Sequence, residues 1–123
     1  MADGSLPEKP PSSLDSSDLV QLLLPSAVSI LENDFRTCGI DPGMEGKLFP
    51  SVFGLRDFIS TLMEKQAAPG SEAFFRLLYR NDLPEKKAMD ALAAENGQRD
   101  SEKIAELIII RALQRAFYRM KYG

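Results

Sequence analysis

Three arginines at four-residue spacing near the end of the chain are the side chains best placed for binding chemistry. Arg111, Arg115 and Arg119 fall within an arc of about 80° on a helical wheel. Tyr118 and Tyr122 lie beside this arginine ridge. Guanidinium groups pair with phosphate and carboxylate oxygens, and tyrosine rings stack on nucleic-acid bases. The pattern therefore indicates a surface that contacts an anionic group.

The charge of the whole chain favours carboxylates as the partners of this ridge. The net charge is -3, and residues 1–50 carry eight acidic side chains against three basic ones. Domains that bind nucleic acid usually show a wider basic surface. We expect internal or intersubunit pairing with acids such as Glu32, Asp34, Asp57 or Glu64. Nucleic acid or another anionic ligand on the ridge is the alternative function.

Catalytic chemistry has little support in the sequence. The chain has no histidine, which removes the commonest general base and metal ligand. Its single cysteine, Cys38, precludes an intrachain disulfide and fits a small buried side chain. Glu102 and Glu106 are one helical turn apart and fit a solvated face better than a metal site. We expect no enzyme activity, no cofactor and no metal.

The first long element is a helix that starts near residues 16–18. Apolar residues recur every three or four positions from Val20 to Phe35, which is one face of a helix. Pro25 interrupts this face, so either two short helices meet there or one helix kinks. Gly39 is placed to cap the C-terminal end.

Four further helices follow, and no segment shows the alternation typical of a strand. Pro50 and Pro84 suit the first helical position of two of them, and Asp100 suits the N-cap of the last. The short connections favour antiparallel neighbours. We predict an all-α compact bundle of about five helices over residues 16–123, with the later helices near 50–66, 71–81, 84–95 and 100–122.

The last predicted helix is the central element, because its first half is apolar nearly all round. Ile104 and Ile108 lie on the same side of this helix as the arginine ridge. The sequence leaves two interpretations open for these isoleucines. Either neighbouring helices enclose them, or they contact a second subunit.

The N-terminal segment and the overall composition predict a disordered tail and the location of the protein. Residues 1–15 are rich in proline, serine and acidic residues, which is typical of a disordered tail. No leader pattern and no apolar run of about 20 residues is present, so we expect a cytoplasmic protein without a membrane partner. The leading hypothesis is a non-enzymatic protein-interaction or assembly module that binds a protein partner or forms a homo-oligomer.

Overall fold

Five helices form the regular structure of residues 6–123, the part of the chain that the computed structural model describes. These helices are α1 (Asp18–Thr37), α2 (Val52–Gln66), α3 (Glu72–Arg80), α4 (Glu85–Ala93) and α5 (Asp100–Tyr122). The same residues contain no strand, so the predicted all-α class is confirmed.

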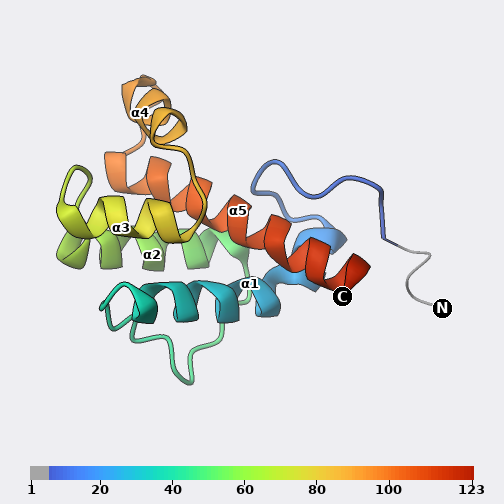
Figure 1. The fold of residues 1–123 in the computed structure, drawn as a ribbon. Helices are drawn as coiled ribbons and strands as arrows, with labels where there is room; N and C mark the ends of the chain where they lie inside the picture. Colours follow the sequence, from blue (N-terminus) through green and yellow to red (C-terminus); the bar gives the residue numbers. More distant parts are fainter. Residues whose placement is uncertain (1–5) are drawn as a thin grey trace.

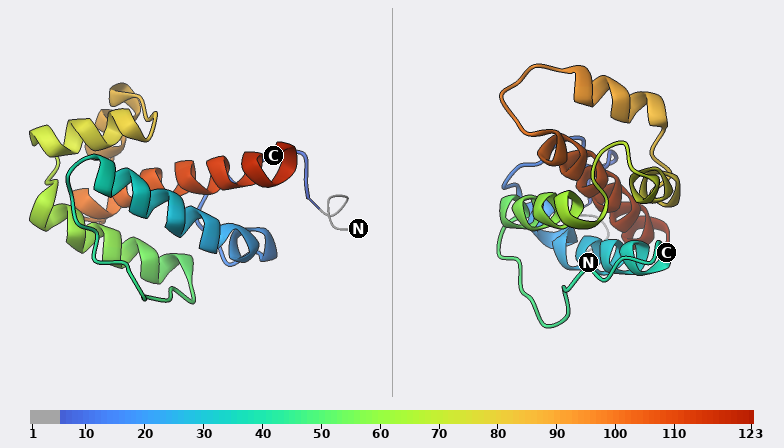
Figure 2. Two further views of the ribbon diagram at one scale, coloured as in Figure 1. Left: turned by 60° about the horizontal axis from the view of Figure 1, so that its bottom comes forward. Right: turned by 90° about the vertical axis from the view of Figure 1, so that its left-hand side faces the viewer.

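Helix α5 is the central element of the bundle, as predicted. It packs against α1 and α2, and α4 also contacts it. Figure 1 shows α5 crossing the molecule diagonally, and the two views of Figure 2 show α4 on the side of α5 opposite to α1 and α2. α5 therefore links the other layers of the fold.

Helix α1 is continuous through Pro25, which resolves the two possibilities that the sequence leaves open. The helix starts where Ser17 Oγ accepts a hydrogen bond from the Val20 N–H. It ends at Thr37, and Gly39 two residues later has a φ of +79°, a left-handed conformation that glycine adopts without strain. The Ile40 N–H then donates to the Phe35 carbonyl, which completes the predicted C-terminal cap.

Helices α2 and α4 begin slightly later than predicted, and neither has proline at its first helical position. Ser51 caps α2, because its hydroxyl accepts hydrogen bonds from two backbone N–H groups of the first turn. Pro50 therefore lies outside the helix. Pro84 has an extended backbone, with ψ at 137°, and α4 starts at the following residue.

The start of α5 also differs from the prediction, because Asp100 is the first helical residue and not the cap. Glu102 makes the capping contact instead. Its carboxylate accepts a hydrogen bond from the Arg99 N–H at 2.9 Å. A glutamate at the third helical position can reach back to the residue that precedes the helix, which a shorter aspartate at the first position cannot do as well.

The apolar first half of α5 is enclosed within this one chain. Ile104 and Ile108 are both 0% exposed. Of the two interpretations open for them, enclosure by neighbouring helices is the one that the structure shows. The prediction that these isoleucines contact a partner is wrong, because neither side chain has any solvent-exposed surface.

The segment before α1 lies along the C-terminal half of α5. Pro11 is buried, and its carbonyl accepts a hydrogen bond from Gln114 Nε2. Lys121 Nζ donates to the carbonyls of Pro7 and Glu8. Residues 1–5 of the predicted tail lie outside the described residues, and disorder over residues 1–15 stays a prediction.

The described helices show no membrane-spanning candidate, since none of them combines sufficient length with sufficient apolar character.

Replacing Pro25 by alanine should raise the stability of the chain. Pro25 is exposed inside α1, where proline lacks the N–H that an interior helical residue donates. Proline is about 3 kcal/mol less favourable than alanine in a helix, and the extra freedom of the unfolded alanine chain offsets roughly 1 kcal/mol of this. Urea unfolding should show a gain of about 1–2 kcal/mol for Pro25→Ala.

The control is Ser26→Ala, at the neighbouring exposed position, which should change stability by about 0.5 kcal/mol or less. A loss of stability in Pro25→Ala would show that the proline bends α1 in a way the packing needs.

Candidate functional site

The arginine ridge is largely engaged with carboxylates of the same chain. Arg115 Nη1 donates to Asp34 Oδ2 at 2.6 Å, and Arg111 Nη2 donates to Asp82 Oδ2 at 3.2 Å. Arg119 makes no ion pair with any described residue. Two of the three guanidinium groups therefore have an internal role.

Asp34 is the acid on which this arrangement centres. Its side chain is 0% exposed, and its second oxygen, Oδ1, accepts a hydrogen bond from Arg80 Nε at 3.1 Å. Asp34 lies on α1, Arg80 ends α3, and Arg115 lies on α5. We call these three residues the Asp34 clamp. The clamp joins three helices at one carboxylate.

Two guanidinium groups offset the cost of burying this carboxylate. A carboxylate that loses its water costs several kcal/mol unless opposite charges and hydrogen bonds replace the water. Both oxygens of Asp34 receive a charged donor, and both arginines keep contact with solvent, at 40% and 23% side-chain exposure. The arginines therefore need little desolvation to hold the buried acid.

The other acids that the sequence offers as ridge partners pair elsewhere. Glu32 pairs with Arg36 on its own helix. Asp57 pairs with Arg56, and Glu64 pairs with Arg99. Among the four candidates, only Asp34 contacts the ridge within the described residues.

The outer end of the ridge is open to solvent. The rings of Tyr118 and Tyr122 stack, with centroids 6.0 Å apart and an interplanar angle of 14°. Arg111, Arg115 and Arg119 line a shallow hollow of about 400 Å³ with these rings. Because Arg111 and Arg115 are already paired, the cationic footprint for an anionic ligand is narrower than the sequence pattern indicates.

A second candidate surface lies on α3, a helix for which the sequence pattern predicts only packing. Phe75 and Tyr79 project from neighbouring turns, with 38% and 89% of their surface exposed. The opposite face of α3 is buried through Phe74, Leu77 and Leu78. The signal in the sequence was the four-residue spacing of two aromatics on the side away from Leu77.

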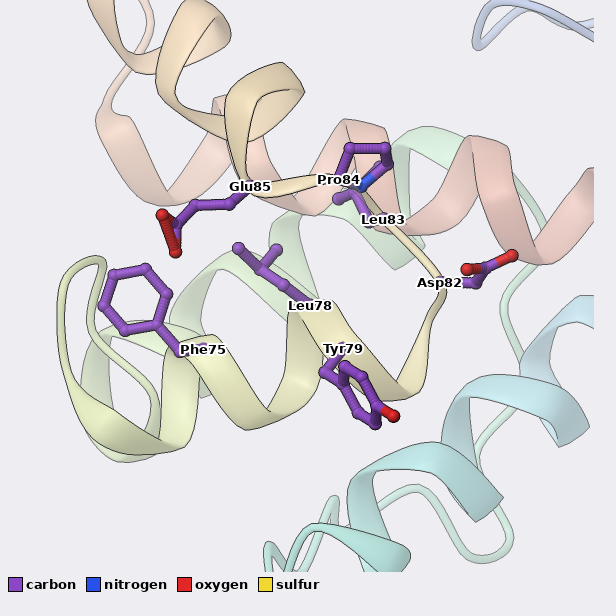
Figure 3. Close-up of a pocket in the computed structure, with 7 residues that line it drawn as sticks. All are labelled: Phe75, Leu78, Tyr79, Asp82, Leu83, Pro84 and Glu85. Atoms are coloured by element: carbon purple, nitrogen blue, oxygen red, sulfur yellow. The ribbon is translucent and has the colours of Figure 1, made fainter.

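Two hollows flank these aromatics, one on each side of α3. Figure 3 shows the hollow between α3 and α4, which has a volume of about 590 Å³ and includes Leu78 and Pro84 in its lining. The hollow toward the end of α1 has a volume of about 640 Å³ and includes Arg76 and Arg80. Phe75 and Tyr79 line both. We call the two aromatics and the two hollows the α3 surface.

The turn after α3 shapes one of these hollows. Asp82 has a φ of +56°, a left-handed conformation usually taken by glycine. The Leu83 N–H donates to the Leu78 carbonyl, and the Leu83 side chain is buried. This turn holds Asp82 and Pro84 at the rim of the hollow between α3 and α4 (Figure 3).

The thiol of Cys38 lies in the hollow toward α1 but is not a good nucleophile. Burial raises the pKa of Cys38, and the nearby negative charge of Asp34 raises it further. A thiol with a raised pKa is protonated at neutral pH, and the thiolate is the reactive form. This cysteine therefore fits a small packed side chain.

Comparison with known proteins identifies no relative of this chain. No family model matches the sequence, and no curated protein or solved structure matches it significantly.

Removing Arg115 should destabilise the chain far more than removing Arg119. Arg115→Ala leaves the buried Asp34 carboxylate with one guanidinium partner, which should cost about 2–3 kcal/mol. Arg119 is exposed and unpaired within the described residues, so Arg119→Ala should cost about 0.5 kcal/mol or less. Urea unfolding followed by circular dichroism measures both.

Equal losses of stability in the two variants would contradict an internal role for the ridge. Arg115→Lys provides a further control, because one ammonium keeps the charge but cannot reproduce the planar guanidinium geometry.

Proposed function

We propose that this chain is a non-enzymatic assembly module that binds protein through the α3 surface, and that its partner is a second copy of the chain. The observation that carries the proposal is the exposure of Phe75 and Tyr79 side by side between two hollows. The Asp34 clamp and the buried face of α3 hold these aromatics in place.

Exposed aromatics of this kind are a recognised feature of interfaces. Tyrosine and phenylalanine contribute a large contact area while losing few rotatable bonds, and tyrosine is enriched at binding hot spots. Single exposed apolar residues are common on any protein and need no partner. Leu48 is such a residue, at 91% exposure, and it lines none of the described hollows. Phe75 and Tyr79 differ because they are adjacent and border shaped cavities.

The chemistry of the described residues supports a binding role over catalysis. The chain has no histidine, and burial raises the pKa of its only thiol. No group of three or more potential metal-ligating side chains gathers within residues 6–123. A lone reduced cysteine also fits a cytoplasmic location, which we include in the proposal.

The size of the α3 surface supports a weak association. A nine-residue helix is about 14 Å long, so the contact between two such faces is smaller than the roughly 1,200–2,000 Å² of standard interfaces. Complexes of this size are often transient. We therefore expect a dimer that forms in the range of about 10–100 µM rather than a permanent one.

Replacing Tyr79 by lysine should weaken self-association by roughly tenfold or more, since it removes an aromatic contact and places a charge at the centre of the interface. Sedimentation velocity over a concentration series measures this. The matched control is Leu48→Lys, which introduces the same charge at an equally exposed apolar residue and should leave association unchanged.

A wild-type chain that stays monomeric up to millimolar concentration would overturn the proposal. So would equal weakening by Tyr79→Lys and Leu48→Lys. Circular dichroism of both variants shows whether they keep the helical content of the wild type.

A further inference from the structure

We infer that two copies pair through the α3 surface about a two-fold axis that runs parallel to α3, so that the basic edge of each copy faces the acidic edge of the other. This inference rests on the proposed self-association. It adds the geometry of the dimer and the charges that select it.

The two edges of the α3 surface carry opposite charges. Arg76 and Arg80 line the hollow on the side of α1, together with one acid, Glu72. Asp82 and Glu85 line the hollow on the side of α4. Phe75 and Tyr79 line both hollows, so the aromatics lie between the two edges. On a helical wheel of α3, Tyr79 is the aromatic nearer to the two arginines. The surface is therefore a central aromatic stripe with a positive flank and a negative flank.

When the internal ion pairs are counted, one positive charge remains on the basic edge, shared by Arg80 and Arg115 around Asp34, and one negative charge remains on the acidic edge, at Glu85. On the basic edge, Glu72 pairs with Arg76 at 2.7 Å, whereas Arg80 shares Asp34 with a second arginine. On the acidic edge, Arg111 pairs with Asp82, and Glu85 has no ion-pair partner among the described residues. The Asp82 side chain is also 87% exposed, so its carboxylate is open to a second contact.

The charges also match in position along the helix. Figure 3 shows Glu85 at the Phe75 end of the hollow and Asp82 at the opposite end, where α3 finishes. Arg76 follows Phe75 directly, and Arg80 is the last residue of α3. Arg76 and Glu85 are therefore at one level along α3, and Arg80 and Asp82 are at the other.

The charges on the two edges determine how two symmetric copies are oriented relative to each other. In a two-fold dimer the same patch meets itself, so each contact occurs twice. If the axis is parallel to α3, the basic edge of one copy meets the acidic edge of the other at the same position along α3. This places Arg76 against Glu85 of the second copy. An axis perpendicular to α3 within the interface places basic edge against basic edge. Like charges across an interface are unfavourable, so the parallel axis is selected.

The orientation also decides which aromatics meet. With the axis parallel to α3, each Tyr79 meets the Tyr79 of the second copy, and each Phe75 meets its own counterpart. Aromatic pairs add favourable energy beyond the area that they bury. The aromatic stripe therefore provides most of the attraction between the two copies, and the charged edges determine their relative orientation.

A charge-exchange experiment tests the inference. Arg76→Glu places two acids against each other on both sides of the dimer axis, and Glu85→Arg places two bases there. Each variant alone should dimerise about threefold to tenfold more weakly than the wild type at low salt. An equimolar mixture of the two should recover affinity to within about twofold of the wild type, because each new charge then meets its opposite.

Sedimentation velocity at about 50 mM salt measures the three affinities, and the differences should shrink at about 500 mM salt. Lys65→Glu, an exposed charge reversal on α2, is the control and should neither weaken the dimer nor be rescued by mixing with Glu85→Arg.

The outcomes separate this inference from the proposed function. If the wild type dimerises but Arg76→Glu strengthens the dimer, the axis lies across α3 and the inferred geometry is wrong. If both variants weaken the dimer and mixing gives no recovery, the edges do not face each other and the inference also fails. Only a wild type that never associates overturns self-association itself.

Discussion

The buried carboxylate of Asp34 is the constraint on which the rest of the structure depends. It is the only charged side chain among the described residues that is fully buried. A carboxylate in this position requires charged donors, and Arg80 and Arg115 supply them from two different helices. The arginine spacing on α5 is therefore explained mainly by what the interior of the bundle needs, and only its outer end is open to solvent.

The pairing of Asp34 with Arg80 also helps to position α3, which carries the surface that we propose as the binding site. α3 has nine residues, too few to be stable alone, so its position is set by what it packs against. Phe74, Leu77 and Leu78 attach it to the core, and the bond from Arg80 to Asp34 fixes its rotation. This rotation turns Phe75 and Tyr79 outward and holds one charged edge in place. The buried apolar face of α3 and the bond to Asp34 together leave Phe75 and Tyr79 on the exposed side.

Much of the fold could be predicted from the sequence, because helical periodicity and caps are local properties. The five helices, the cap at Gly39 and the central place of α5 all follow from spacing and residue type. The charge balance predicts carboxylate partners for the arginine ridge, but it does not single out Asp34 from the four candidate acids. Asp34 and Arg115 are 81 positions apart and meet only through the packing of α1 on α5. Burial of Ile104 depends in the same way on neighbouring helices, and the α3 surface depends on which side of a short helix is left uncovered.

Native-state hydrogen exchange in the Asp34→Asn variant tests the central claim most directly. We predict that the backbone amides of α3 lose protection by at least about tenfold more than those of α2, because the ion pairs of the clamp include a residue of α3 and none of α2. An equal loss of protection in α2 and α3 would contradict the account, since it would show that Asp34 contributes only to global stability and does not fix α3.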